Sequence, residues 1–175
     1  MASNEISSRV DMAEDLFPSL ERDYDWNRID FRAYKGVDVC GALSANSKLK
    51  SSSIGFQTFD FLWMETKKQK TDPFEMLAQL FLTAKPIIDK GHMPPKFFAC
   101  YDTETIAIVS CLDSLAVFSA NDMNWTETAS SPSEKTAAIM KRILDGKLIV
   151  FKTRDRKTIK DWVKSNYQAP GHNFP

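Results

Sequence analysis

The chain has 175 residues, of which 43% are hydrophobic and 26% are charged, the usual balance of a soluble globular domain. No apolar run approaches the roughly 20 residues of a membrane helix, so a membrane protein is not expected. The 23 basic and 23 acidic side chains cancel. This neutrality argues against a strongly basic, self-sufficient nucleic-acid binder, but it suits a catalytic domain that a partner delivers to its substrate.

The first third of the chain predicts a helix followed by strands. Apolar residues recur at helical spacing in residues 5–25, so this segment is predicted to be mainly helical and divided by Pro18. Alternation of polar and apolar residues in 28–34 predicts a strand, and residues 35–44 are expected to form a second one. The serine-rich segment 44–53 is typical of a polar loop.

A buried strand and a well-marked helix are predicted next. The sequence FDFLWMETK, residues 59–67, is apolar until its end, where it carries Glu65 and Lys67. Residues 71–91 are predicted to be helical, with Asp72 as the N-cap, a proline at the first helical position and a broad apolar stripe.

The remaining segments complete a mixed α/β pattern. Expected elements are a hairpin of residues 96–102 and 105–112, a short strand at 115–120, a helix at 131–146 capped by Ser131, a strand at 147–153 and a basic helix at 154–167. This order indicates one α/β (α+β) domain, residues 1–167, with a central mixed sheet flanked by helices. Residues 168–175 are expected to be a tail or linker.

The cysteines and the first residues suggest the compartment. Cys40, Cys100 and Cys111 lie among apolar residues without CxxC spacing, which predicts buried free thiols and no zinc site. Because no basic segment followed by an apolar one opens the sequence, no signal peptide is expected. A reducing, cytoplasmic location is therefore predicted.

The end of the predicted strand 59–67 carries the residues most suited to chemistry. Residues two apart in a strand point the same way, so Glu65 and Lys67 should project together, about 6.5 Å apart. Asp38 lies in the neighbouring predicted strand and could approach Glu65 if the two strands pair. Two close carboxylates repel unless a cation lies between them, and Mg²⁺ or Mn²⁺ suits such oxygen ligands.

This pattern resembles the PD-(D/E)xK nuclease superfamily, the fold of many restriction endonucleases. In that family an Asp on one strand is followed by Glu-x-Lys on the next, here Asp38 and the ETK of Glu65 to Lys67. Gln79 matches a helix Gln found in the nuclease domains of type I restriction subunits and of fused restriction–modification enzymes. Those domains often carry an aromatic residue four positions later, where this chain has Thr83.

The resemblance implies a restriction-endonuclease-like fold and a Mg²⁺-dependent (or Mn²⁺-dependent) DNA endonuclease. Asp38, Glu65 and the Thr66 carbonyl would hold the metal, Lys67 would assist the attacking water, and Gln79 would support the site. An additional acid from the first helical region is implied, and either Glu14 or Glu21 could supply it. The implied partners are DNA and a specificity or methyltransferase domain or subunit of a restriction–modification or related defence system.

Several alternatives accompany this interpretation. Asp60 and Asp30 are weaker alternatives to Asp38, since Asp60 should point to the opposite face from Glu65 and Asp30 belongs to an earlier predicted strand. The domain could also be a non-catalytic DNA- or protein-interaction module of the same fold. A third possibility is an unrelated α/β binding protein in which Glu65 and Lys67 form an ion pair at the strand end.

Basic residues outside the motif are interpreted mainly as solvated. Lys68 and Lys70 follow the Glu-x-Lys strand and could also touch a phosphate backbone. For the basic C-terminal segment, a solvated helix face is favoured over a DNA contact. Its basic residues are Lys152, Arg154, Arg156, Lys157, Lys160 and Lys164.

Overall fold

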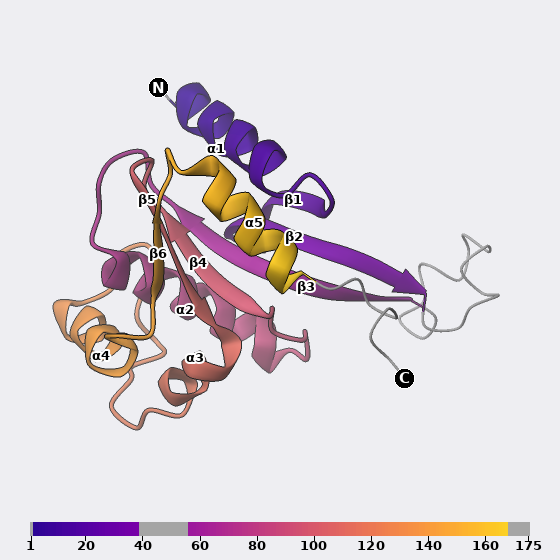
Figure 1. The fold of residues 1–175 in the computed structure, drawn as a ribbon. Coiled ribbons are helices and arrows are strands. Elements are labelled where there is room, and N and C mark those ends of the chain that lie inside the picture. The colour runs from indigo at the N-terminus through magenta and orange to yellow at the C-terminus, as the bar shows by residue number, and fades with distance from the viewer. Residues whose placement is uncertain (1, 39–55, 168–175) are drawn as a thin grey trace.

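The computed structural model describes residues 2–38 and 56–167, which form five helices and six strands (Figure 1). In chain order the elements are α1 (Ala2–Leu16), β1 (Glu21–Trp26), β2 (Ile29–Asp38), β3 (Phe56–Thr66), α2 (Pro73–Asp89), β4 (Phe97–Tyr101), β5 (Thr105–Ser110), α3 (Cys111–Phe118), α4 (Glu134–Leu144), β6 (Ile149–Lys152) and α5 (Arg156–Asn166).

The strands form one six-stranded sheet in the order β1-β2-β3-β4-β5-β6. All neighbours are antiparallel except β3 and β4, which are parallel. A parallel pair needs a crossover connection, and α2 supplies it between β3 and β4. The prediction of a mixed sheet flanked by helices is confirmed.

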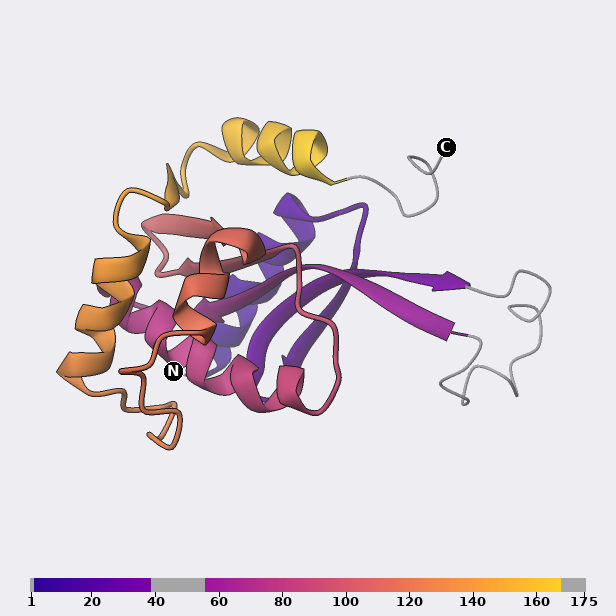
Figure 2. The same ribbon diagram turned by 90° about the horizontal axis from the view of Figure 1, so that it is seen from below.

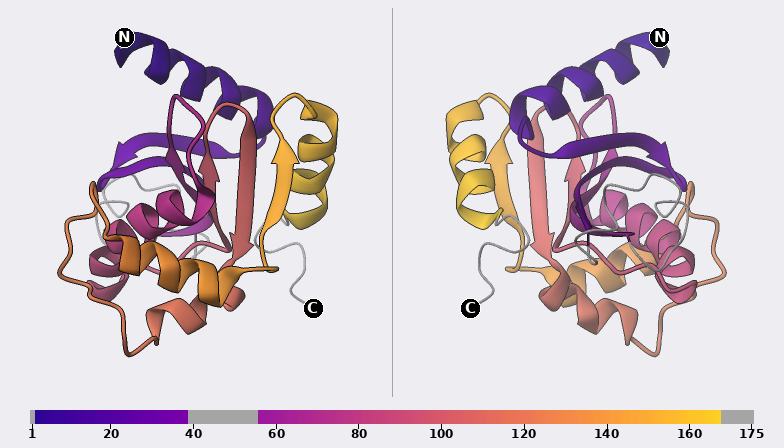
Figure 3. Two further views of the ribbon diagram at one scale, coloured as in Figure 1. Left: turned by 90° about the vertical axis from the view of Figure 1, so that its left-hand side faces the viewer. Right: turned by 90° about the vertical axis from the view of Figure 1, so that its right-hand side faces the viewer.

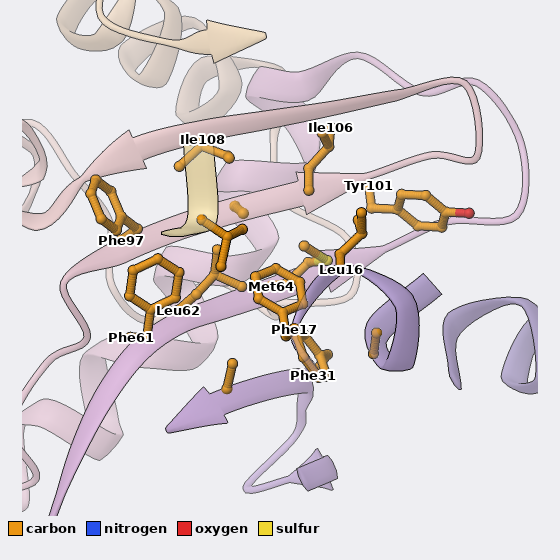
Figure 4. Packing of buried hydrophobic residues seen from close by; sticks show 14 of the residues in the cluster. Leu16, Phe17, Phe31, Phe61, Leu62, Met64, Phe97, Tyr101, Ile106 and Ile108 are labelled. Atoms are coloured by element: carbon orange, nitrogen blue, oxygen red, sulfur yellow. The ribbon is translucent and has the colours of Figure 1, made fainter. Parts of the chain in front are cut away.

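Helices cover both faces of the sheet (Figure 3). On one face, α1 and α5 enclose an apolar core in which Leu16, Phe17, Phe31 and Met64 are buried (Figure 4). The other face packs against α2 and α3, with α4 against α2, and buries residues such as Trp63. The two apolar layers fix β3 from both sides, so the polar end of this strand is held firmly in place.

The outer parts of β2 and β3 extend beyond the helices as a two-stranded ribbon (Figures 1 and 2). Strand β2 is continuous from Ile29 to Asp38, with an irregularity in its pairing to β3 between Ala33 and Tyr34. The prediction of two strands, 28–34 and 35–44, is therefore wrong as far as Asp38, and residues 39–44 lie outside the described part.

The prediction of helix through residue 25 is also wrong. Helix α1 ends at Leu16, and residues 21–26 form the edge strand β1. Trp26 pairs with Ile29, which leaves a two-residue turn whose members Asn27 and Arg28 have φ of 49° and 70°. Positive φ at both positions suits a tight hairpin turn, so β1 forms by pairing with β2.

Two further differences concern the second half of the chain. Residues 115–120 were expected to form a strand, but 111–118 form α3, whose N-cap Ser110 accepts a hydrogen bond from the Asp113 N–H at 3.0 Å. Helix α4 is capped by Ser133 rather than Ser131. By contrast, Asp72 caps α2 as predicted, accepting from the Phe74 N–H at 3.2 Å.

Cys100 is a buried free thiol, and Cys111 is a half-buried one. Cys40, the predicted loop 44–53 and the predicted tail 168–175 lie outside the described residues. Within residues 2–38 and 56–167, no helix has both the length and the apolar character needed to cross a membrane.

Candidate functional site

The start of β2 and the end of β3 bring two carboxylates together. Phe31 is paired with Met64, so Asp30 and Glu65 are the next residues along the two antiparallel strands. Such cross-strand neighbours share a face of the sheet, with Cβ atoms roughly 5 Å apart. Glu65 is only 8% exposed, whereas the side chain of Asp30 is 26% exposed. The pair therefore has a buried member and a member open to solvent.

Asp30 is tied to β3 through Thr66. Its Oδ2 atom accepts hydrogen bonds from the Thr66 N–H at 2.8 Å and from the Thr66 hydroxyl at 3.1 Å. These bonds occupy one carboxylate oxygen and orient the other. Asp30 is thus held by the end of the same strand that carries Glu65.

Arg9 of α1 is the counter-ion of the solvent-facing acid. Its Nη1 atom donates to the Asp30 carbonyl at 3.0 Å and lies 3.3 Å from Asp25 Oδ1 and 3.6 Å from Asp30 Oδ1. Arg9 is 6% exposed, so the guanidinium is buried next to Asp30. It balances part of the charge of Asp30.

Lys67 completes the group from the segment that follows β3. Its Nζ atom lies 3.6 Å from Glu65 Oε1, and its backbone N–H donates to the Tyr101 carbonyl at 2.8 Å. The side chain is about one-third exposed. An ammonium therefore lies at the mouth of the site, next to the buried carboxylate, as the two-residue spacing predicted.

Asp30, Glu65 and Lys67 line one pocket of about 230 Å³. Its lining residues are Arg28, Asp30, Glu65, Lys67, Gln79, Thr83, Thr128, Ala129 and Ser130. Gln79 is 7% exposed and donates from Nε2 to the Ser130 carbonyl at 3.4 Å. Helix α2 thus adds an amide to the pocket, and the segment before α4 forms the opposing wall.

Burial dominates the electrostatics of the site. It raises the pKa of Glu65 from 4.5 to about 8, and the Asp30 carboxylate adds to the rise, while Lys67 opposes it. Without a further cation Glu65 therefore carries a proton at neutral pH. A divalent cation between the two acids would stabilise the ionised form, and the oxygen donors fit Mg²⁺.

The ligand set is small. Among the described residues there is no cluster of three or more His, Cys, Asp or Glu side chains placed to hold a metal. Asp30 and Glu65 offer two carboxylates, and Mg²⁺ commonly binds one or two while keeping several waters. The residues present are compatible with a water-rich Mg²⁺ site.

The expectation that Asp38 approaches Glu65 is wrong. Asp38 pairs with Phe56, nine residues before Glu65 on the same strand. At about 3.3 Å per residue, this places their backbones roughly 30 Å apart. In an antiparallel pair, the residue level with the end of β3 must come from the start of β2, and that residue is Asp30.

Neither candidate for an additional acid lines this pocket. Glu14 is exposed on α1, and Glu21 begins β1, where it pairs with Tyr34 at the far end from the Trp26–Ile29 turn. The residue that α1 directs at the site is Arg9. Thr66 contacts the site through its N–H and hydroxyl groups, which both donate hydrogen bonds to Asp30.

Sequence reasoning ranked Asp30 below Asp38 and missed Arg9. The signal for Asp30 was the dipeptide Asn27-Arg28 between two alternating segments, which makes β1 and β2 a hairpin and places Asp30 near the start of β2. Nothing in the local sequence marks Arg9, whose contact partners lie 16 and 21 residues away.

A larger pocket, of about 610 Å³, lies between the end of α1 and α5. Its walls are apolar residues such as Phe17 and Val163, rimmed by lysines and arginines. Asp161 is the one carboxylate among its lining residues, so the smaller pocket, which has two, is the better candidate for metal-assisted chemistry. Comparisons of this chain with protein-family models, with curated proteins and with solved structures found no match.

Proposed function

We propose that this chain is a Mg²⁺-dependent deoxyribonuclease that hydrolyses phosphodiester bonds in the pocket of Asp30, Glu65 and Lys67. The observation that carries the proposal is the meeting of these three side chains at the end of two adjoining strands, with Lys67 Nζ 3.6 Å from Glu65 Oε1. Gln79 joins the pocket from α2, as the resemblance to PD-(D/E)xK nucleases implies.

The order of elements supports a restriction-endonuclease-like fold. A helix precedes three antiparallel strands, and the third strand leads through α2 to a parallel neighbour. The Asp and Glu-x-Lys residues then fall on the second and third strands, with Asp30 in the place that the sequence pattern suggested for Asp38. We therefore assign to Asp30 the role that the resemblance gave to Asp38.

Each residue has a role in this proposal. Asp30 and Glu65 would hold the metal, which would supply a bound water of lowered pKa and positive charge next to a phosphate oxygen. Lys67 orients the attacking water and stabilises the charge that builds on the phosphate. Burial around Glu65 keeps the site in a low dielectric, where these interactions are strong. Gln79 holds the opposing wall of the pocket in place by its hydrogen bond to the Ser130 carbonyl.

The neutral net charge suggests that sequence recognition resides elsewhere. We therefore propose that the chain acts as the nuclease domain or subunit of a restriction–modification or related defence system. A specificity or methyltransferase domain or subunit would be the partner that selects the DNA. This assignment places the protein in the cytoplasm, beside its DNA substrate.

Supercoiled plasmid incubated with the full chain and Mg²⁺ tests the proposal. We expect nicked or linear DNA, a loss of rate on the order of 100-fold or more in Asp30→Asn, and no loss in Asp38→Asn. Cleavage that continues in Asp30→Asn, or that survives EDTA, would contradict the assignment. The two Asp→Asn variants remove the same charge from the same strand, so they control for effects on folding.

A non-catalytic module of the same fold is the second candidate. The observation that favours it is Arg9, since a fixed guanidinium 3.6 Å from Asp30 can neutralise part of the acid pair without a metal. Calorimetry separates the two candidates: the nuclease must bind Mn²⁺ at this pocket, whereas the module does not need to.

A further inference from the structure

Unpaired cations gather at the end of the sheet that carries the acidic pocket. They are Arg28, Lys68, Lys70, Lys152 and Arg154, all exposed and none with an ion-pair partner among the described residues. Arg28 lines the pocket itself. Arg28 lies in the turn before β2, and Lys68 and Lys70 lie in the segment after β3. Lys152 is the last residue of the outer strand β6, and Arg154 follows it.

Strand pairing puts these residues in one row. Thr66 pairs with Tyr101 across β3 and β4, and Thr105 pairs with Lys152 across β5 and β6. These residues therefore lie at the same end of the sheet (Figure 1). Neighbouring strands are about 4.8 Å apart, which makes the distance from β2 to β6 roughly 19 Å. The acidic pocket lies within this row, between Arg28 and the cations of β6.

Three other basic residues of the C-terminal segment are neutralised. Arg156 and Lys160 lie 3.5 and 2.9 Å from Asp15 of α1, and Lys157 lies 3.4 Å from Asp161. This arrangement agrees with a solvated helix face for α5. Lys152 and Arg154 precede the helix and have no such partner among the described residues, so two of the three unpaired basic residues of this segment lie at the end of the sheet, and the third, Lys164, lies in the last turn of α5.

The acids at this end reduce its positive charge only in part. Asp102 is 2% exposed and accepts hydrogen bonds from the backbone N–H groups of Thr71, Glu104 and Thr105. These bonds lower its pKa and turn its charge inward. Asp25, Asp72, Glu104 and Asp155 are exposed at this end. Asp25 is paired with Arg9, and the five unpaired cations outnumber the other three acids.

Aromatic side chains do not contribute to this surface. In residues 9–35 and 60–167, every Phe, Tyr and Trp side chain is buried or half-buried. Proteins that hold single-stranded nucleic acid usually stack its bases on accessible aromatic rings. A row of cations without such rings instead suits the phosphates of a duplex, which contacts proteins through its backbone.

We propose that this end of the sheet is a docking surface for the sugar–phosphate backbone of double-stranded DNA, which it binds independently of sequence. A row of roughly 19 Å matches about six base pairs at 3.4 Å each. For the reaction, the inference rests on the proposed nuclease function, because the docked backbone would pass over the pocket of Asp30 and Glu65. The binding itself requires only the cations.

Fluorescence anisotropy with a labelled 20-base-pair duplex tests this surface. The full chain carrying Glu65→Gln is titrated at several salt concentrations, so that cleavage does not interfere. We expect Lys152→Gln/Arg154→Gln to weaken binding roughly ten- to fiftyfold at 0.1 M salt. The slope of log affinity against log salt should fall by about 2, one unit for each lost phosphate contact.

The matched control is Lys90→Gln/Lys164→Gln. These exposed lysines lie at the far ends of α2 and α5, and their replacement removes the same charge. We expect the control to bind like its parent. Unchanged affinity of Lys152→Gln/Arg154→Gln, an equal loss in the control, or tighter binding of a single-stranded 20-mer than of the duplex would overturn the inference.

The two proposals fail separately in this experiment. Duplex binding with the expected salt slope, without plasmid cleavage by the unmodified chain, would support the docking surface and contradict the nuclease function. Cleavage that requires Asp30, together with duplex binding that is unchanged when Lys152 and Arg154 are replaced, would support the nuclease function and contradict the docking surface.

Discussion

Asp30 and Thr66 join the start of β2 to the end of β3 by two hydrogen bonds to a single carboxylate oxygen, at 2.8 and 3.1 Å. The bonds fix Asp30 beside the buried Glu65 while leaving its second oxygen directed at Arg9 and the solvent. A strand end that would otherwise fray is thereby closed by side-chain contacts. The geometry of the acid pair depends on this link.

Replacement of Thr66 by Val tests the link. Val keeps the shape and the backbone N–H but removes the hydroxyl bond, so we expect a loss of about 1 kcal/mol in the free energy of unfolding. Urea denaturation measures it. Thr158→Val, at an exposed position of α5, is the control and should stay within about 0.5 kcal/mol. Equal stability of the Thr66 variant and the unmodified chain would show that the bond contributes nothing.

The raised pKa of Glu65 predicts a specific pH dependence. Because its pKa goes from 4.5 to about 8 on folding, the folded state binds the extra proton between these values. The contribution of Glu65 to stability is therefore lost as pH rises from about 4.5 to 8. Glu65→Gln cannot ionise, so at pH 9 in EDTA it should be more stable than the unmodified chain, by about 5 kcal/mol at most.

Urea unfolding at pH 5 and pH 9 measures this difference. Near pH 5 the variant and the unmodified chain should have similar stability, since Glu65 is then protonated. Glu104→Gln changes an exposed turn residue and serves as the control, with no pH-dependent gain expected. A Glu65→Gln variant whose stability follows that of the unmodified chain at both pH values would rule out a buried, proton-binding Glu65.

The role of Lys67 separates cleavage from metal binding. Lys67→Met keeps the apolar stem but removes the ammonium, so we expect plasmid cleavage to slow by roughly 10²- to 10⁴-fold. Mn²⁺ should still bind, because the acids remain and a nearby positive charge is gone. Lys90→Met is the control for loss of a surface lysine. Loss of Mn²⁺ binding with unchanged cleavage would reverse the roles proposed here.

Arg9 should compete with a divalent cation for the acid pair. Removal of its charge in Arg9→Gln should tighten Mn²⁺ binding roughly three- to tenfold, as expected for repulsion between cations several ångströms apart. Arg22→Gln is the matched control, since Arg22 bonds the carbonyls of Phe17 and Leu20 and not the acids. Weaker Mn²⁺ binding in Arg9→Gln would mean that Arg9 supports the site by holding Asp30 in place.

The sequence predicted elements that are determined locally. Helix α2 is set by its cap at Asp72 and its apolar stripe, and the hairpin of β4 and β5 by two apolar runs around a turn. Residues 21–26 were misjudged because ERDYDW suits either a helix or an exposed strand. Its conformation is decided by pairing with β2, which is a non-local interaction.

The site was predictable to the same extent. Glu65 and Lys67 needed only the two-residue period of a strand, and Gln79 needed only the helix that follows. The acid partner depended on which part of β2 is level with the end of β3. That register is set by the two-residue turn before β2 and by the apolar faces of both strands, so Asp30 occupies the position predicted for Asp38.

Calorimetric titration of the full chain with Mn²⁺ tests the pairing of Asp30 and Glu65 most directly. We predict binding in the unmodified chain and in Asp38→Asn with equal affinity, and at least about 100-fold weaker binding in Asp30→Asn, which loses a charged ligand. Binding that persists in Asp30→Asn and disappears in Asp38→Asn, or that is absent from the unmodified chain, would contradict a metal site between these two strands.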